Sequence, residues 1–287
     1  MKLYCAVVDA ETVRMFHEIT KGSIKLNVLI SYFYIKGNAN KLTNLYRHMI
    51  DSLIMDSGAY SVAMGKSKIS VTEYKLYLKR YGHLYDHVFN LDDKFDNPEH
   101  NQRHQDYLQK DVARERWPIP VVHSEDDPEG EVQIYVNQGH EYIALGSLGK
   151  NRKFDADTVA RIMEKFPDVK FHLFGNFDRE ILTTCRPYSA DSATWGHKAG
   201  YGSLYYWDPD EKKEYSIYME HRDTKQQPGQ ILYRDLEPKL KGKFDKFLAS
   251  TFGYDYARLL NDQTSMQIVN IYFFTQLESH INSLPAR

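Results

Sequence analysis

The sequence predicts an α/β fold, namely a (β/α)8 TIM-like barrel followed by a helical C-terminal extension. Short apolar runs rich in β-branched and aromatic residues recur along the 287-residue chain, and stretches with helical periodicity separate them. This alternation indicates a parallel sheet with right-handed crossovers, and about eight such units favour closure into a barrel. The sequence contains no Gly-rich G-x-G-x-x-G turn, the motif that would indicate a dinucleotide-binding fold. Some units are irregular, so an open doubly wound sheet is the alternative.

The expected strands and helices follow one another in order. The strands cover residues 24–35, 53–55, 87–91, 119–122, 142–145, 170–174 and 188–190, and a further extended stretch covers 203–207. The helices between them cover residues 42–49, 71–81, 98–114, 130–138, 155–166 and 179–184. Two of these helices have clear start signals, because Asn97 precedes Pro98 and because Ser70 with Glu73 fits a capping box.

The pattern of charged and apolar residues changes near Arg234. Residues 239–243 are basic, and residues 244–260 and 265–281 have the pattern of amphipathic helices. We therefore expect two parts, a barrel over residues 1–233 and a helical extension over residues 234–287 that packs on it.

Composition narrows the classes of protein that fit. The net charge of -2 excludes a generic polyanion binder, although a local basic patch could still bind nucleic acid. Cys5 and Cys185 are too far apart in sequence for a zinc knuckle and make a poor disulfide framework. No N-terminal segment combines a basic start, an apolar core and a small-residue cleavage site, and no run of ~18 apolar residues could span a bilayer. These features predict a protein that has no membrane association and that resides in the cytoplasm, or in the host cytoplasm if a phage encodes it.

Active sites of such barrels lie at the carboxyl ends of the strands, so the residues after each apolar run are the candidates. Aspartates stand at three of these positions, and glycines, hydroxyls and one imidazole stand at the others. The segments are Asp56-Ser57-Gly58-Ala59-Tyr60, Asp92-Asp93-Lys94, His123-Ser124, Gly146-Ser147-Leu148-Gly149, Gly175-Asn176 and Asp191-Ser192-Ala193-Thr194-Trp195.

Each aspartate alone could equally be a helix N-cap. Together, three acids at one barrel mouth would repel one another, which indicates function. Paired carboxylates serve glycosyl transfer, where one attacks an oxocarbenium-like centre and another acts as acid or base. Alternatively, His123 with these acids could bind a metal ion. The histidines show no H-x-H or H-E-x-x-H pattern, so metal-free chemistry is favoured, with magnesium held by the acids still open.

The order of the motifs resembles the tRNA-guanine transglycosylase superfamily, and within it the DpdA-type enzymes of phages and bacteria, which put 7-deazaguanines into DNA. The resemblance covers residues 53–202. Asp56-Ser57-Gly58-Ala59-Tyr60 is similar to the segment that ends an early strand of that family, and Asn90-Leu91-Asp92 to its base-reading motif. Gly146-Ser147-Leu148-Gly149 is similar to a pocket turn of that family, and the segment 189–195 to the nucleophile motif of its phage branch.

The resemblance implies a glycosyltransferase that replaces guanine by a 7-deazaguanine such as preQ0 and needs no cofactor or metal. Asp191 would be the nucleophile and Asp56 the base that deprotonates the incoming heterocycle. Asp92 would bind the guanine edge. The other expected substrate-binding residues are Ser57, Gly58, Tyr60, His123, Gly146, Ser147, Leu148 and Trp195, with Tyr60 or Trp195 as a stacking surface.

The partners expected from the resemblance are DNA and the free base. The tRNA branch has a Cys-x-Cys-x-x-Cys and His zinc site near its C-terminus, and no cysteine follows Cys185 here, which favours DNA over tRNA. Phosphate contacts are expected from Lys66, Lys68, Lys150, Arg152 and Lys198. The alternatives are a tRNA-guanine transglycosylase, a nucleoside or glycoside hydrolase, a metal-dependent barrel hydrolase, and a barrel that only binds a partner.

Overall fold

The computed structural model describes residues 1–35, 40–65, 68–146, 148, 152–220 and 224–285. The chain divides into two compact units, the first made of Met1–Val7 and Asn27–Ser192 and the second of Val8–Leu26 and Ala193–Arg287. This division differs from the boundary expected at residue 234. It falls after Ser192, and it also assigns the segment 8–26 to the second unit.

The first unit is the barrel that the sequence predicts. Its eight parallel strands are in the order β4-β3-β2-β1-β8-β7-β6-β5. A parallel bridge between Phe89, just beyond β4, and Ile119, just before β5, joins the two ends of this series. The strands are β1 (Lys2–Ala6), β2 (Leu26–Ser31), β3 (Ile50–Asp56), β4 (His87–Val88), β5 (Val121–Val122), β6 (Tyr142–Leu145), β7 (Lys170–Leu173) and β8 (Ser189–Ser192).

One barrel strand differs from the sequence prediction. β1 was not expected, yet it pairs with β2 and β8 and brings Tyr4 level with Asp191. The stretch 203–207, expected as an extended run after the barrel strands, forms β9 (Ser203–Asp208) in the second unit. It pairs antiparallel with β10 (Lys213–Tyr218) and is therefore not a barrel strand.

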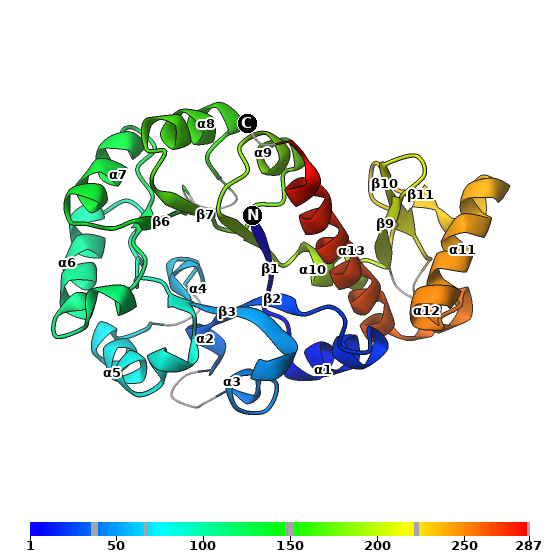
Figure 1. Ribbon diagram of the computed structural model, residues 1–287, viewed down its shortest axis with the longest axis horizontal. Coiled ribbons are helices and arrows are strands. Elements are labelled where there is room, and N and C mark those ends of the chain that lie inside the picture. Colours follow the sequence, from blue (N-terminus) through cyan, green and yellow to red (C-terminus); the bar gives the residue numbers. More distant parts are fainter. Residues whose placement is uncertain (36–39, 66–67, 147, 149–151, 221–223, 286–287) are drawn as a thin grey trace. The chain divides into compact units, whose positions relative to one another are not determined.

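Helices surround the barrel strands, and α5 to α9 lie round their outside (Figure 1). Two expected helices are shorter than predicted, because the stretch 42–49 is divided in two and the stretch 98–114 ends at Gln109. The helical elements of this unit are α2 (Tyr32–Ile35), α3 (Lys41–Asn44), η1 (Arg47–Met49), α4 (Ala59–Ala63), α5 (Val71–Tyr81), η2 (Gly82–Leu84), α6 (Pro98–Gln109), η3 (Arg114–Arg116), α7 (Pro128–Asn137), α8 (Ala156–Lys165) and α9 (Arg179–Thr184).

The second unit combines helices with a small three-stranded sheet in the order β11-β10-β9. Besides β9 and β10 it contains α1 (Ala10–Ile19), α10 (Thr194–Gly200), β11 (Ile231–Leu232), η4 (Tyr233–Asp235), α11 (Pro238–Phe252), α12 (Tyr256–Asn261) and α13 (Gln263–Ser283). The helix expected over 244–260 is broken, because Gly253 adopts a left-handed conformation (φ 70°) that ends α11. None of the described helices is long and apolar enough to cross a membrane.

A single buried side chain ties the second unit together. Asn270 of α13 is fully buried, and its amide nitrogen donates to the carbonyl oxygens of Trp195 and Ser203 at 3.0 and 3.1 Å. Its amide oxygen accepts from the backbone nitrogen of Tyr205 at 2.8 Å. One asparagine thus satisfies three backbone groups around α10 and β9, which fixes both elements against α13.

Candidate active site

Three aspartates lie at the carboxyl ends of barrel strands. Asp56 is the last residue of β3, Asp191 lies in β8, and Asp92 follows β4. Asp92 and Asp191 are each only 5% exposed. The charges of both act on the carboxyl group of Asp56, so the three acidic groups lie within electrostatic reach of one another, as the strand-end rule predicts.

Asp56 has the strongest electrostatic signature of the three. Burial, reinforced by the charges of Asp92 and Asp191, raises its pKa to about 7, and the amide of Gly58, which donates to Oδ2 at 3.0 Å, opposes the shift. Gly58 must be glycine, because its φ is 87° and a Cβ would lie 2.5 Å from Cβ of Phe33. Near neutral pH Asp56 is thus populated in both protonation states and can donate or accept a proton.

Asp191 is held through one of its two carboxylate oxygens. Oδ1 accepts from the backbone amide of Gly175 at 2.8 Å and lies 3.2 Å from Nε2 of His172. The other imidazole nitrogen, Nδ1, lies 2.7 Å from Oγ of Ser189, which in turn lies 2.6 Å from the hydroxyl of Tyr142. His172 is fully buried, so this chain fixes the imidazole and through it the orientation of the carboxylate.

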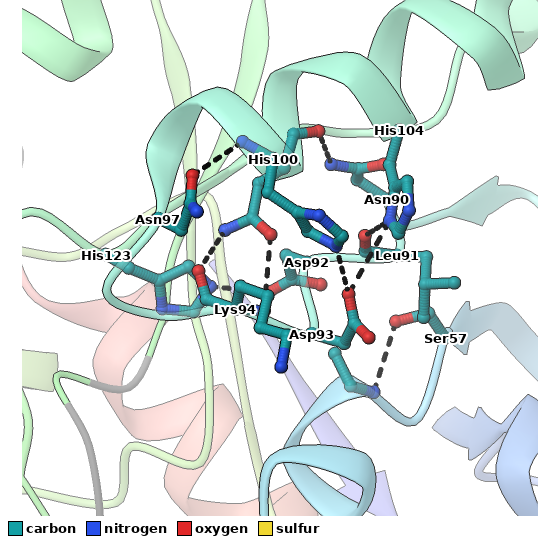
Figure 2. A network of polar contacts seen from close by, with 12 residues as sticks. Ser57, Asn90, Leu91, Asp92, Asp93, Lys94, Asn97, His100, His104 and His123 are labelled. Atoms are coloured by element: carbon teal, nitrogen blue, oxygen red, sulfur yellow. Dashed lines mark hydrogen bonds and ion pairs between the residues drawn. The ribbon is translucent and has the colours of Figure 1, made fainter. Parts of the chain in front are cut away.

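Asp92 forms a buried pair with His123, whose Nε2 lies 2.6 Å from Oδ2 (Figure 2). The carboxylate of Glu131 accepts from the backbone amides of His123 and Ser124 at 3.0 and 2.8 Å, which anchors the segment after β5. Gly146 leaves room for the ring, because a Cβ there would lie 2.4 Å from Cε1 of His123. The backbone at His123 is therefore anchored by Glu131, and its ring is held by Asp92.

An aromatic surface adjoins this pair. The ring of Phe95 is stacked on His123 at 4.4 Å between centroids, and Tyr60 is stacked on Phe95 at 6.4 Å. Both Phe95 and His123 line a hollow of about 670 Å³, together with Leu148. The hollow therefore lies beside the Asp92–His123 pair and has the size of a small-ligand pocket.

The other residues expected to bind the base have mixed placements. Ser57 is fully buried and its hydroxyl accepts from the amide of Ala59 at 3.3 Å, so it supports the turn. Tyr60 is 44% exposed and available for stacking. Trp195 lies in α10 of the second unit and is only 4% exposed. Its ring is buried in the core there, which leaves Tyr60 as the stacking surface of the two that were expected. Ser147 lies outside the described residues.

The expected phosphate contacts are only partly described, since Lys66 and Lys150 lie outside the described residues. Lys68 is exposed, whereas the guanidinium of Arg152 forms an ion pair with Glu125. Lys198 belongs to the second unit, where its ammonium lies 3.2 Å from the hydroxyl of Ser216.

Several residues that the sequence interpretation did not include are part of the site or adjoin it. His172 contacts Asp191, and Phe95 contacts His123. Asp93, His100 and His104 form a compact cluster whose ligand atoms could hold a metal ion. The sequence signal for the cluster was the H-x-x-x-H spacing, which places two imidazoles on one helix face.

Comparison with known proteins gives the fold and little else. No family model and no curated protein matches the sequence. Among solved structures, the chain is similar to a putative fructose-1,6-biphosphate aldolase from Coccidioides immitis. The TM-score is 0.53 and the sequence identity 14%, over 97% of this chain and 89% of that one. The fold is a TIM-like barrel. At this level of identity the likeness carries no information on the reaction.

Proposed function

We propose that this protein is a base-exchange transglycosylase that replaces guanine in DNA by a 7-deazaguanine such as preQ0. The observation that carries the proposal is Asp56, a buried carboxylic acid whose pKa is raised to about 7 by burial and by the charges of two further acids, Asp92 and Asp191. Glycosyl transfer requires such an arrangement, in which one group exchanges protons at neutral pH beside a second carboxylate that is held in place.

The first half-reaction breaks the bond between the sugar and guanine. Oδ2 of Asp191 attacks C1′ and forms an ester, while the C1′–N9 bond breaks and its electron pair leaves with guanine. Protonated Asp56 gives its proton to the departing base. Gly175 and His172 hold Oδ1, which orients Oδ2 towards the anomeric carbon and stabilises the carboxylate before attack.

The second half-reaction uses the same two acids in reverse. Asp56, now a carboxylate, takes the N9 proton of the incoming 7-deazaguanine. The freed electron pair of N9 forms the new bond to C1′, and the ester bond to Asp191 breaks. The site returns to its starting state with Asp56 protonated, so no redox group and no external acid or base is consumed.

Base recognition is assigned to the Asp92–His123 pair and its aromatic neighbours. His123 engages Oδ2 of Asp92, which leaves Oδ1 to accept hydrogen bonds from N1–H and the exocyclic amine of guanine. Phe95 and Tyr60 provide faces on which a flipped-out base stacks. We assign to Lys153, whose ammonium donates to the carbonyl of Gly175, a contact with a phosphate beside the attacked sugar.

The test is to incubate the protein with preQ0 and either duplex DNA or tRNA, and then to digest the nucleic acid and measure its nucleosides by mass. We expect 7-deazaguanine nucleosides from DNA, and their loss in Asp191→Asn. Asp168→Asn serves as the control, because Asp168 is an exposed acid of the same unit. Incorporation into tRNA alone would change the substrate, whereas abasic sites without incorporation would identify a hydrolase and overturn the proposal.

A further inference from the structure

A second polar cluster lies beside the candidate active site and takes no part in the proposed reaction. It consists of Asp93, His100 and His104, and one ligand atom from each lies within 4.8 Å of the other two (Figure 2). Nε2 of His100 lies 2.9 Å and Nδ1 of His104 lies 3.6 Å from Oδ1 of Asp93. The centroids of the two imidazole rings are 4.2 Å apart.

The local fold explains why these side chains meet. His100 and His104 are four residues apart on α6, which places both on one face of the helix. Asp93 comes from the segment between β4 and α6. Asn101 fastens that segment to the helix, because its side chain accepts from the amide of Lys94 at 3.3 Å and donates to the carbonyl of Lys94 at 2.8 Å. The carboxylate is thus positioned by the helix that carries the imidazoles.

We propose that this cluster is a binding site for one divalent transition-metal ion of the Zn²⁺ type. Two imidazoles and a carboxylate are the donors that such ions prefer. An ion about 2.1 Å from each donor in tetrahedral geometry separates the donors by about 3.4 Å, and the 2.9 and 3.6 Å separations from Oδ1 of Asp93 bracket that value. Nδ1 of His104 donates to the carbonyl of Leu91 at 2.7 Å, so coordination through this nitrogen releases its proton and exchanges the hydrogen bond for the ion.

The site is open to solvent on one side. The side chains of His100, His104 and Asp93 retain 27, 16 and 15% of their exposure. An ion can therefore enter without unfolding, and a coordination position is left for water or an anionic ligand. Because Asp93 directly follows Asp92, a bound ion fastens the segment that carries the base-reading carboxylate to α6. The inference does not depend on the proposed exchange reaction.

The experiment uses tag-free, chelator-treated, full-length protein titrated with Co²⁺ and with Zn²⁺. Visible absorption follows Co²⁺, and calorimetry and a thermal melt follow Zn²⁺. We expect one equivalent to bind, with a d–d absorption band for Co²⁺ and a rise in the melting temperature with Zn²⁺. His100→Ala, His104→Ala and Asp93→Asn should each weaken binding about tenfold or more.

His83→Ala is the matched control, because His83 is an exposed histidine of the same unit, and it should bind as the wild type does. The melt of each variant without metal shows whether it folds, and three separate ligand variants keep the test decisive if one of them does not. Absence of a saturable equivalent in the wild type, or equal affinity in the folded ligand variants and His83→Ala, would overturn the assignment.

Discussion

Replacing Asp56 by asparagine should stabilise the protein at alkaline pH. In the unfolded chain this carboxyl group loses its proton near pH 3.8, whereas in the folded protein burial and the neighbouring acids hold the pKa at about 7. Between these values the unfolded state has lost the proton that the folded state retains, so the folded state loses stability as the pH rises. The shift of about 3 pKa units, at 1.36 kcal/mol each, corresponds to at most about 4 kcal/mol.

Asparagine has the same shape and no charge, so it removes this cost. We expect Asp56→Asn and the wild type to have equal free energies of unfolding at pH 4, and the variant to be more stable by about 2–4 kcal/mol at pH 8. Urea unfolding followed by circular dichroism at both pH values measures the difference. Asp168→Asn, at an exposed position, should give no such pH-dependent gain.

An equal difference in unfolding free energy between Asp56→Asn and the wild type at pH 4 and pH 8 would refute this prediction, since it would show that the change does not act through charge.

Three further substitutions test the structure at other positions. Gly146→Ala places a Cβ 2.4 Å from the ring of His123, so the ring must move. We expect the free energy of unfolding in urea to fall by about 1–3 kcal/mol and the exchange activity to fall as well. His172→Ala removes a contact of Asp191 and should lower kcat about 10–100-fold with little change in KM, as expected for a positioning residue; an unchanged kcat would refute that role. Asn270→Ala leaves three backbone groups without their side-chain partner, and should cost about 2–4 kcal/mol of unfolding free energy; a loss below about 1 kcal/mol would show that water replaces the amide.

The sequence predicted the barrel because its strands are short, apolar and separated by well-capped helices. It did not predict β1, whose buried stretch Leu3–Ala6 is short. The stretch 203–207 has the same composition as a barrel strand, but β10 pairs with it antiparallel. Composition alone does not distinguish a parallel barrel strand from an antiparallel strand, because strands of either kind can bury most of their side chains.

The three acids of the candidate site could be predicted because parallel strands end at one rim. His123, the partner of Asp92, was expected at the site for the same reason, whereas other neighbours of the acids were not. His172 lies inside β7 and reaches Asp191 across neighbouring strands, so a search limited to strand ends passes over it. Trp195 follows the Asp191 motif directly, but the helix that begins at Thr194 turns its ring into the core. Asp93 meets His100 and His104 through the segment between β4 and α6, which the side chain of Asn101 fastens to the helix.

The proposed reaction requires Asp191 to form a covalent bond to the sugar of a nucleic acid. It is tested most directly by mixing the protein with a guanine-containing DNA duplex without acceptor base, quenching in acid, and mapping the adduct by peptide mass spectrometry. We predict an oligonucleotide adduct on the peptide that contains Asp191, discharged by preQ0 and absent in Asp191→Asn. An adduct on the peptide that contains Asp56, or base exchange that persists in Asp191→Asn, would contradict the account.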